Sequence, residues 1–300
     1  MKTRGFVTLA TGDAHYRKLA ANLLHSYWLH TENPLPFALV TDREGPDTDA
    51  FDHVILRPGA GGNYLDKLDL FDVLPFDNTI FIDADCLAYG DLNVLFDWFA
   101  SADDVSCHGR VLPLSDKTGW FDYENLGPLQ EKVSYGVGLH GGIYYIRRTE
   151  KAKAVFETAK KLAEHYGDYK FRGNFPTPGE EPLIALAMAV HGCRPIPFRP
   201  EGICCYWEHR RNLRFDRKGA VLKSTGHRPL LIHWGTRFTR ELEYRKQVAL
   251  LDILETSSDN LEKRIAKCTA RYDRLMRQER MKRFVIRVKN KILRTLGIRK

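Results

Sequence analysis

The segment Thr79–Leu92, with the sequence TIFIDADCLAYGDL, could bind a metal ion. Its apolar start predicts a buried strand that ends in Asp83, Ala84 and Asp85. Because side chains two positions apart on an extended chain point the same way, both carboxylates can face one cation. Hard divalent cations such as Mg²⁺ and Mn²⁺ prefer these oxygen ligands. We therefore favour a metal site here over a solvated strand end.

Polar residues also follow other apolar segments of the chain. Gly5–Ala10 and Phe37–Val40 are predicted strands, and they are followed by Thr11 and Asp42. Ligand sites of open α/β sheets lie at the carboxyl ends of the strands. We therefore expect these residues to share one edge of a sheet with the aspartate pair.

The elements that would position these residues alternate between strands and helices. This alternation is typical of an α/β fold, in which a mainly parallel sheet is flanked by helices. Two long connections, Pro113–Ser134 and Tyr169–Gly179, are candidates for a lid or an acceptor loop. Further strands are predicted over residues 53–56, 105–112, 142–146 and 229–233, and helices over 16–30, 64–74, 150–166, 182–191, 240–254 and 261–298.

The composition is that of a globular protein, with 43% hydrophobic and 28% charged residues in a chain of 300. This length allows one large α/β domain with an appendage. The six cysteines form no C-x-x-C pair, which favours a reducing compartment over a zinc site. With no signal peptide or membrane-spanning stretch visible, we expect a cytoplasmic protein.

The basic charge is concentrated in the C-terminal tail. Residues 271–300 contain twelve Lys or Arg and two acids, more than enough to account for the net charge of +8. Apolar residues recur at helical spacing over Phe284–Ile298, so we expect residues 256–300 to form a basic amphipathic helical tail after a catalytic domain over 1–255. Such a helix suits an anionic membrane surface, on the inner face for a cytoplasmic protein.

Two further interpretations of basic segments stay open. The tail could instead pack on its own domain or on a partner subunit, and no nucleic-acid-binding module is visible, so no nucleic acid is expected. The loop Trp207–Lys218 (WEHRRNLRFDRK) could hold an anionic acceptor or donor phosphates, although we favour a solvated face.

Four motifs occur in the order of a known family. These are GFVTLATGDAHY from Gly5, YLDKLDL from Tyr64, IFIDADCLAYGDL from Ile80, and LIHWG from Leu231. Together they resemble GT-A-fold glycosyltransferases, and especially the glycogenin-like and lipopolysaccharide galactosyltransferase family (family 8), over about residues 5–240. The resemblance implies a GT-A-like, Rossmann-like mixed sheet, mainly parallel and flanked by helices, with a C-terminal helical extension.

The resemblance also implies roles for individual residues. Asp83, Asp85 and His233 would bind Mn²⁺ or Mg²⁺, and imidazole suits Mn²⁺ better. A nucleotide-sugar donor, with UDP the favoured nucleotide, would contact the metal through its diphosphate. The implied donor-binding residues are Thr8, Ala10, Thr11, Asp42, Lys67, Asp83, Ala84, Asp85, Gly235 and Arg237.

The chain departs from the family pattern at two places. Where the family has an F-N-[SA]-G element, this chain has His140-Gly141-Gly142, which we still expect to contact the donor sugar. The family's D-Q pair corresponds to Glu180-Glu181, and we expect one of these carboxyls to lie near the anomeric carbon. For Glu180, a helix N-terminus that favours an acid is an equally good explanation.

The sequence therefore predicts a metal-dependent glycosyltransferase. It would transfer a sugar from a UDP-sugar to a glycan or glycolipid acceptor, with retention implied by the resemblance. A metal stabilises the diphosphate leaving group as a Lewis acid. A nucleotide-sugar-forming nucleotidyltransferase would need a glycine-rich phosphate loop, which Ala10–Asp13 does not supply. A non-catalytic basic binding protein is disfavoured by the intact metal-ligand set.

Overall fold

The computed structural model describes residues 3–172, 178–216, 219–256 and 260–295. The chain divides into two compact units, Met1–Gly235 and Thr236–Lys300. The first unit contains every strand of the described residues.

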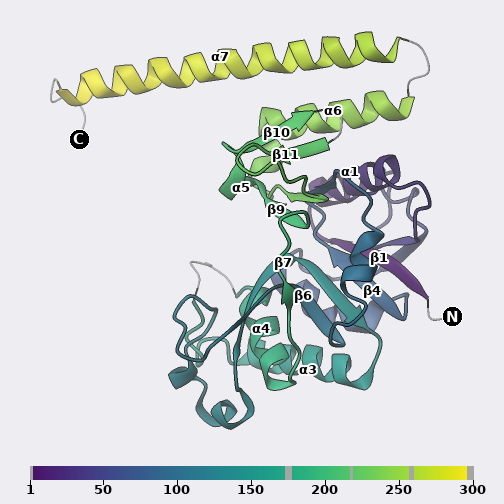
Figure 1. Cartoon of the computed structure of the whole chain (residues 1–300), viewed down its shortest axis with the longest axis vertical. Helices are drawn as coiled ribbons and strands as arrows, with labels where there is room; N and C mark the ends of the chain where they lie inside the picture. Colours follow the sequence, from purple (N-terminus) through teal and green to yellow (C-terminus); the bar gives the residue numbers. More distant parts are fainter. Residues whose placement is uncertain (1–2, 173–177, 217–218, 257–259, 296–300) are drawn as a thin grey trace. The chain divides into compact units, whose positions relative to one another are not determined.

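A seven-stranded mixed sheet forms the centre of the first unit, with the strand order β3-β2-β1-β4-β7-β6-β8 (Figure 1). The first four strands are parallel to one another, and β7 is antiparallel to both of its neighbours. The predicted mixed, mainly parallel sheet is thereby confirmed. The strands are β1 (Arg4–Ala10), β2 (Phe37–Thr41), β3 (His53–Leu56), β4 (Asn78–Ile82), β6 (Val105–Leu112), β7 (Gly136–Arg147) and β8 (Ile196–Pro197).

Helices cover the two faces of this sheet. Side chains alternate along β1, so that Phe6 packs against Tyr27 of helix α1 (Ala14–His30), whereas Val7 belongs to the cluster formed with α3 and α4. This second layer consists of α3 (Glu150–Glu164), α4 (Glu180–Val190) and the 3₁₀ helix η1 (Tyr64–Val73). Both sheet faces are therefore buried, which explains the continuous apolar runs in the strands.

A second, three-stranded sheet has the order β5-β12-β9, and its strand β5 follows the aspartate pair directly. It consists of β5 (Cys86–Ala88), β12 (Leu231–His233) and β9 (Ile203–Cys205). Nearby in the sequence lie the short helix α5 (Tyr206–His209) and the hairpin β10 (Leu213–Asp216)–β11 (Gly219–Leu222). Three other short elements are α2 (Val94–Trp98), η2 (Tyr123–Asn125) and η3 (Gly127–Lys132).

The second unit is helical and contains η4 (Phe238–Arg240), α6 (Leu242–Thr256) and α7 (Leu261–Thr295). It begins before the expected tail start at residue 256, because α6 packs against α7 and an ion pair of 2.9 Å joins Lys246 Nζ to Asp273 Oδ1. Residues 257–259 and 296–300 of the expected tail lie outside the described residues. Within the described residues, no helix is long and apolar enough to span a bilayer.

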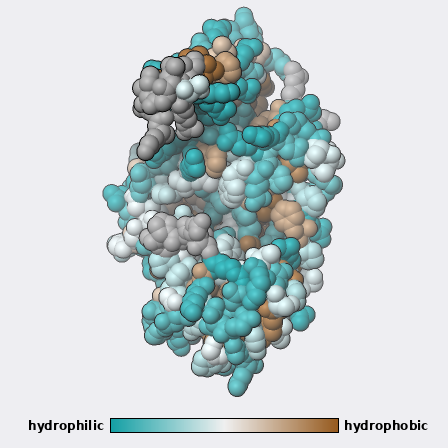
Figure 2. Space-filling model, turned by 90° about the vertical axis from the view of Figure 1, so that its left-hand side faces the viewer, coloured by the Kyte–Doolittle hydropathy of each residue, from teal (hydrophilic) through white to brown (hydrophobic). Residues whose placement is uncertain are grey.

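The distal half of α7 exposes several large apolar side chains. Met281, Phe284, Val285 and Val288 are 40–63% exposed and recur at three- and four-residue spacing. On the face of the molecule in Figure 2, hydrophilic residues predominate and apolar residues form small, separate groups. Large apolar side chains are also exposed at separate positions of the first unit, such as Leu56 and Phe198, whereas those on α7 follow one another along a single helix.

Candidate active site

The predicted aspartate pair lies at the carboxyl end of the buried strand β4. The Asp83 N–H donates to Gly142 O (3.1 Å), and the Cys86 N–H donates to Asp83 O (3.1 Å), so the backbone turns directly into β5. Asp85 is 8% exposed. Two strands and a tight turn therefore hold both carboxylates in place.

Strand β12 brings His233 to this pair across more than 140 residues of sequence. In the β12–β5 register His233 lies opposite Cys86, and the Trp234 N–H donates to Asp85 O (3.0 Å). His233 Nε2 lies 3.0 Å from Asp85 Oδ1 and 3.7 Å from Asp83 Oδ2. The structure thus brings together the three residues that the sequence predicts as metal ligands.

His233 and Asp85 have the separation expected for two ligands of one divalent cation, whereas Asp83 lies farther from the imidazole. Neighbouring ligands of an octahedral ion with bonds of about 2.1–2.2 Å lie about 3 Å apart. Burial lowers the pKa of His233, but Asp85 and then Asp83 outweigh it, so that this pKa is raised overall. An excess of negative charge therefore surrounds the imidazole, as a cation site requires.

Cys86 is a neighbour of this site that the sequence did not predict. Its Sγ lies within 4.8 Å of ligand atoms of Asp85 and His233. Burial, followed by the charge of Asp85, raises the pKa of the Cys86 thiol well above its usual value. Carboxylate and imidazole ligands suit Mn²⁺ or Mg²⁺ better than a thiol does.

Lys67 links the aspartate pair to helix α4. Its Nζ lies 2.7 Å from Asp83 Oδ1 and 2.6 Å from Glu180 Oε1, and the lysine side chain is 10% exposed. Burial opposes the charge of Lys67, but Asp83 and Glu180 outweigh burial and raise its pKa. The pKa of Asp83 is raised in turn by burial, with Lys67 and His233 opposing this shift. Lys67 is therefore a permanent cation beside the predicted diphosphate site.

The two glutamates at the start of α4 have different surroundings. Glu180 is 3% exposed and paired with Lys67, whereas Glu181 Oε1 accepts a hydrogen bond from the Gly141 N–H (2.6 Å). Burial, followed by the charge of Glu180, raises the pKa of Glu181 to about 7. A Cβ at Gly141 would lie 2.7 Å from Glu181 Oε1, so only glycine allows this approach.

The His140 side chain points toward Cys205 and His233, and its predicted contact with the donor sugar stays a prediction. The Gly142 N–H donates to its Nδ1 (3.1 Å), and its Nε2 lies 2.8 Å from Cys205 Sγ and 3.3 Å from His233 Nδ1. Burial, followed by the charge of His233, lowers the pKa of His140 to about 3. The neutral ring packs beside His233 because Gly142 lacks the Cβ that would lie 2.8 Å from His140 Cε1.

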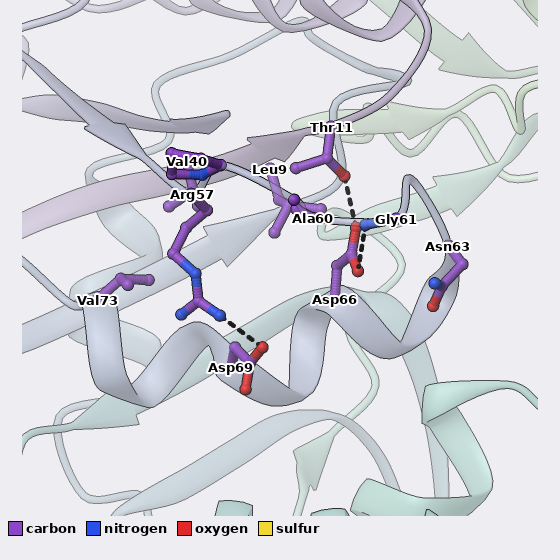
Figure 3. Close-up of a pocket in the computed structure, with 12 residues that line it drawn as sticks. Leu9, Thr11, Val40, Arg57, Ala60, Gly61, Asn63, Asp66, Asp69 and Val73 are labelled. Carbon is purple, nitrogen blue, oxygen red and sulfur yellow. Dashed lines mark hydrogen bonds and ion pairs between the residues drawn. The ribbon is translucent and has the colours of Figure 1, made fainter. Parts of the chain in front are cut away.

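A cavity of about 380 Å³ opens beside the ends of β1, β2 and β3 (Figure 3). Thr11 Oγ1 donates to Asp66 Oδ2 (2.7 Å), and Arg57 Nη2 donates to Asp69 Oδ2 (2.7 Å). Positive φ angles at Gly12 and Gly62 let the two backbones approach closely enough to bring Thr11 to Asp66. The lining residues are Leu9, Thr11, Val40, Arg57, Pro58, Gly59, Ala60, Gly61, Asn63, Asp66, Asp69 and Val73.

The other predicted donor contacts in β1 and β2 stay predictions. Thr8 and Ala10 are 0% and 1% exposed inside the sheet. Asp42 accepts from the Gly12 N–H (3.1 Å) and pairs with Arg17 and Arg43. Burial opposes its charge, but the Arg43 hydrogen bond and other contacts lower the pKa of Asp42 overall. Of the residues predicted at this end, only Thr11 lines the cavity.

Two of the remaining predicted residues, Ala84 and Gly235, adjoin the predicted metal ligands or follow them closely in the sequence. Ala84 is 6% exposed between the two aspartates, and Gly235 adopts a φ of +70° directly after Trp234. Arg237 belongs to the second unit, where its guanidinium lies 5.7 Å from the ring centre of Phe238. Its contact with the donor stays a prediction.

The fold itself is known from solved structures. No protein-family description matches the sequence, and no curated protein matches it either. The galactosyltransferase LgtC, solved with donor and acceptor sugar analogues, matches 87% of this chain and 99% of its own, with 12% identity and a TM-score of 0.55. The glycosyltransferase GlyE of Streptococcus pneumoniae TIGR4 matches 90% of this chain and 64% of its own, with 13% identity and a TM-score of 0.51. The chain therefore has the GT-A-like fold that the sequence predicted.

Proposed function

We propose that the protein is a metal-dependent glycosyltransferase that uses a nucleotide-sugar donor, with UDP the favoured nucleotide. The observation that carries this proposal is the convergence of Asp83, Asp85 and His233 at the carboxyl edge of a GT-A-like sheet, on the same edge as a cavity. The similar structure of LgtC, a galactosyltransferase, was solved with donor and acceptor sugar analogues. By the family resemblance, the transfer would retain the anomeric configuration.

The metal site would serve the leaving group. Asp83, Asp85 and His233 would hold Mn²⁺ or Mg²⁺, which supplies Lewis-acid stabilisation of the negative charge that develops on the diphosphate. Lys67 adds a fixed cation from the protein, 2.7 Å from Asp83. Because Lys67 is buried and ionised, it can stabilise developing charge without being screened by water.

Glu181 is the better candidate of the two glutamates for a position beside the anomeric carbon. Glu180 is committed to its ion pair with Lys67 at 2.6 Å. Glu181 instead accepts a hydrogen bond from the Gly141 N–H, which fixes its position. A carboxylate there can stabilise the positive charge that develops on the sugar during transfer.

The nucleoside would occupy the cavity at the ends of β1–β3. Thr11 and Asp66 line it, with hydrogen-bonding groups suited to a base or a ribose (Figure 3). The acceptor would be a glycan or a glycolipid. We further propose that α7 attaches the enzyme to an anionic membrane, since its cations alternate with exposed Met281, Phe284, Val285 and Val288.

A calorimetric titration with UDP tests the proposed function. Wild-type protein should bind UDP in Mn²⁺ and lose most of this affinity in EDTA. Asp85→Ala should lose the metal-dependent part of the binding. Asp97→Ala is the matched control. It replaces an exposed aspartate on α2 and should bind UDP as the wild type does. Failure of wild-type protein to bind any nucleoside diphosphate would refute the assignment.

A further inference from the structure

An exposed tryptophan lies beside the candidate metal ligands. The Trp207 ring centre is 5.0 Å from that of His233 in an edge-to-face arrangement, and it stacks on His140 at 6.2 Å and 18°. The Trp207 side chain nevertheless remains 38% exposed. A large aromatic surface next to a sugar-transfer centre is a natural platform for the C–H face of a saccharide.

The local fold explains why Trp207 is held at this point. Strand β9 pairs with β12 so that Cys205 lies beside His233, and α5 starts directly afterwards. Tyr206 turns inward and stacks on Trp234 at 4.2 Å. Trp207, the next residue, is therefore directed outward, with its orientation fixed by the two histidines.

The order of the elements places Trp207 away from the nucleoside cavity. That cavity lies at the ends of β1–β3, followed along the sheet by β4 with the aspartates and by β7 with His140. Trp207 contacts His140 of β7 and His233 of β12, so it lies on the side of the site formed by these two strands. With the nucleotide in the cavity, Trp207 would face the sugar and acceptor side.

Two arginines follow Trp207 at helical spacing. Arg210 and Arg211 come three and four residues later, Arg210 with helical backbone angles, and both are exposed. Residues at this spacing lie on the same side of a helical turn. Guanidinium groups bind phosphate and carboxylate with paired hydrogen bonds. Arg214, in the following strand β10, lies 3.6 Å from Asp216.

We propose that Trp207, Arg210 and Arg211 form an acceptor subsite for a saccharide that carries a phosphate or carboxylate group. Trp207 stacks on the sugar ring, and the arginines pair with its anionic substituent. This inference rests on the proposed function, because it assigns the acceptor class for the same site. For Trp207, Arg210 and Arg211, it also replaces the interpretation of a solvated face with that of a binding surface.

Saturation-transfer NMR and calorimetry in UDP and Mn²⁺ test this subsite. The probes are glucose 6-phosphate and digalacturonate, compared with glucose and maltose. Wild-type protein should prefer an anionic probe by about tenfold over its neutral counterpart. The double variant Arg210→Gln/Arg211→Gln should lose this preference, and Trp207→Leu should weaken binding of both probe types. Arg214→Gln is the matched control and should keep the wild-type preference.

The UDP affinity of each variant separates failure of this inference from failure of the proposed function. If wild-type protein binds UDP with Mn²⁺ but shows no anionic preference, the acceptor inference alone is wrong. If the double arginine variant keeps the preference, the arginines are not the anion ligands and the inference is again wrong. Loss of UDP binding by wild-type protein would refute the proposed function itself. Because Trp207 contacts His233, the arginine variant carries the test if Trp207→Leu disturbs the metal site.

Discussion

Lys67 and Lys117 make the same contacts in different surroundings. Lys67 Nζ lies 2.7 and 2.6 Å from Asp83 and Glu180, and Lys117 Nζ lies 2.9 Å from both Asp122 and Glu124. The Lys67 side chain is 10% exposed, whereas that of Lys117 is 58% exposed. Distances alone would rank these two clusters as equal.

Burial separates the two clusters. Water and salt screen the exposed ions around Lys117, so their pairing contributes little to stability. Around Lys67, each ion has lost its hydration and depends on the others for compensation. The buried cluster also joins η1, α4 and the end of β4 at the edge of the sheet where the predicted metal ligands lie. The comparison teaches that a charge cluster is informative about function where the fold keeps it away from water.

Replacing each lysine by methionine gives the largest expected difference. Lys67→Met leaves two carboxylates unpaired and should lower the free energy of unfolding by about 3–5 kcal/mol. Lys117→Met should leave the urea midpoint unchanged within error. Equal effects of the two substitutions on the urea midpoint would show that burial does not distinguish the clusters.

Glu181 extends the comparison to a carboxyl group that accepts its hydrogen bond from a backbone N–H and not from a lysine. Folding raises its pKa from 4.5 to about 7. The contribution of the neutral carboxyl group to the free energy of unfolding is therefore fully present below about pH 4.5, and it is lost as the pH rises through about 7. Glu181→Gln, which keeps an acceptor for the Gly141 N–H, should be more stable than the wild type at pH 8 by about 1–3 kcal/mol. The two proteins should have equal stability at pH 4, as measured by denaturant titration without metal. A constant difference at all pH values would contradict the raised pKa.

The same comparison between buried and exposed contacts applies to two histidines, His140 and His165. His140 Nε2 lies 3.3 Å from His233 Nδ1 in a buried cluster, whereas His165 Nδ1 lies 3.5 Å from Asp168 Oδ2 with both side chains more than 60% exposed. His140→Ala should weaken Mn²⁺ binding, followed by electron paramagnetic resonance, by about tenfold because it supports a ligand. His165→Ala should not change it. Unaltered Mn²⁺ affinity in His140→Ala would leave His140 with packing as its only role.

Substitutions on the exposed helix α7 should have the smallest effect on the candidate active site. Replacing Phe284 and Val288 by serine should leave UDP affinity unchanged. Binding to vesicles that contain anionic lipid should fall in a cosedimentation assay, since these side chains are 61% and 40% exposed. Gln278→Ala on the same helix is the control. Vesicle binding that is equal in all three proteins would refute membrane attachment through this face.

The edge of the sheet was predictable because strand ends carry local signals. An apolar run that stops at Asp83 and Asp85 marks both the strand and the site, and the motif order places His233 with them. Side-chain direction was not predictable: His140 has the expected position in the sequence, but the short contact with Cys205 turns it toward His233. Cys205 belongs to a strand of three residues, too short to show a period.

The cavity that we propose for the nucleoside also depends on contacts that the sequence did not predict. Asp66 was visible as part of a motif, yet its contact with Thr11 depends on the close approach of Gly12 and Gly62 across the fold. Burial of Thr8 and Ala10 depends on α1 and the neighbouring strands, which local sequence does not specify. Tertiary packing thus determines which residues of the motif line the cavity.

Release of UDP from UDP-sugars is the measurement that tests the central claim most directly. Wild-type protein, incubated with a panel of UDP-sugars and Mn²⁺, should hydrolyse at least one of them slowly even without an acceptor. EDTA and Asp85→Ala should each abolish this release, and Asp97→Ala should not. If no UDP-sugar or other nucleotide-sugar is cleaved by protein that binds both metal and nucleotide, the site is not a glycosyltransferase centre.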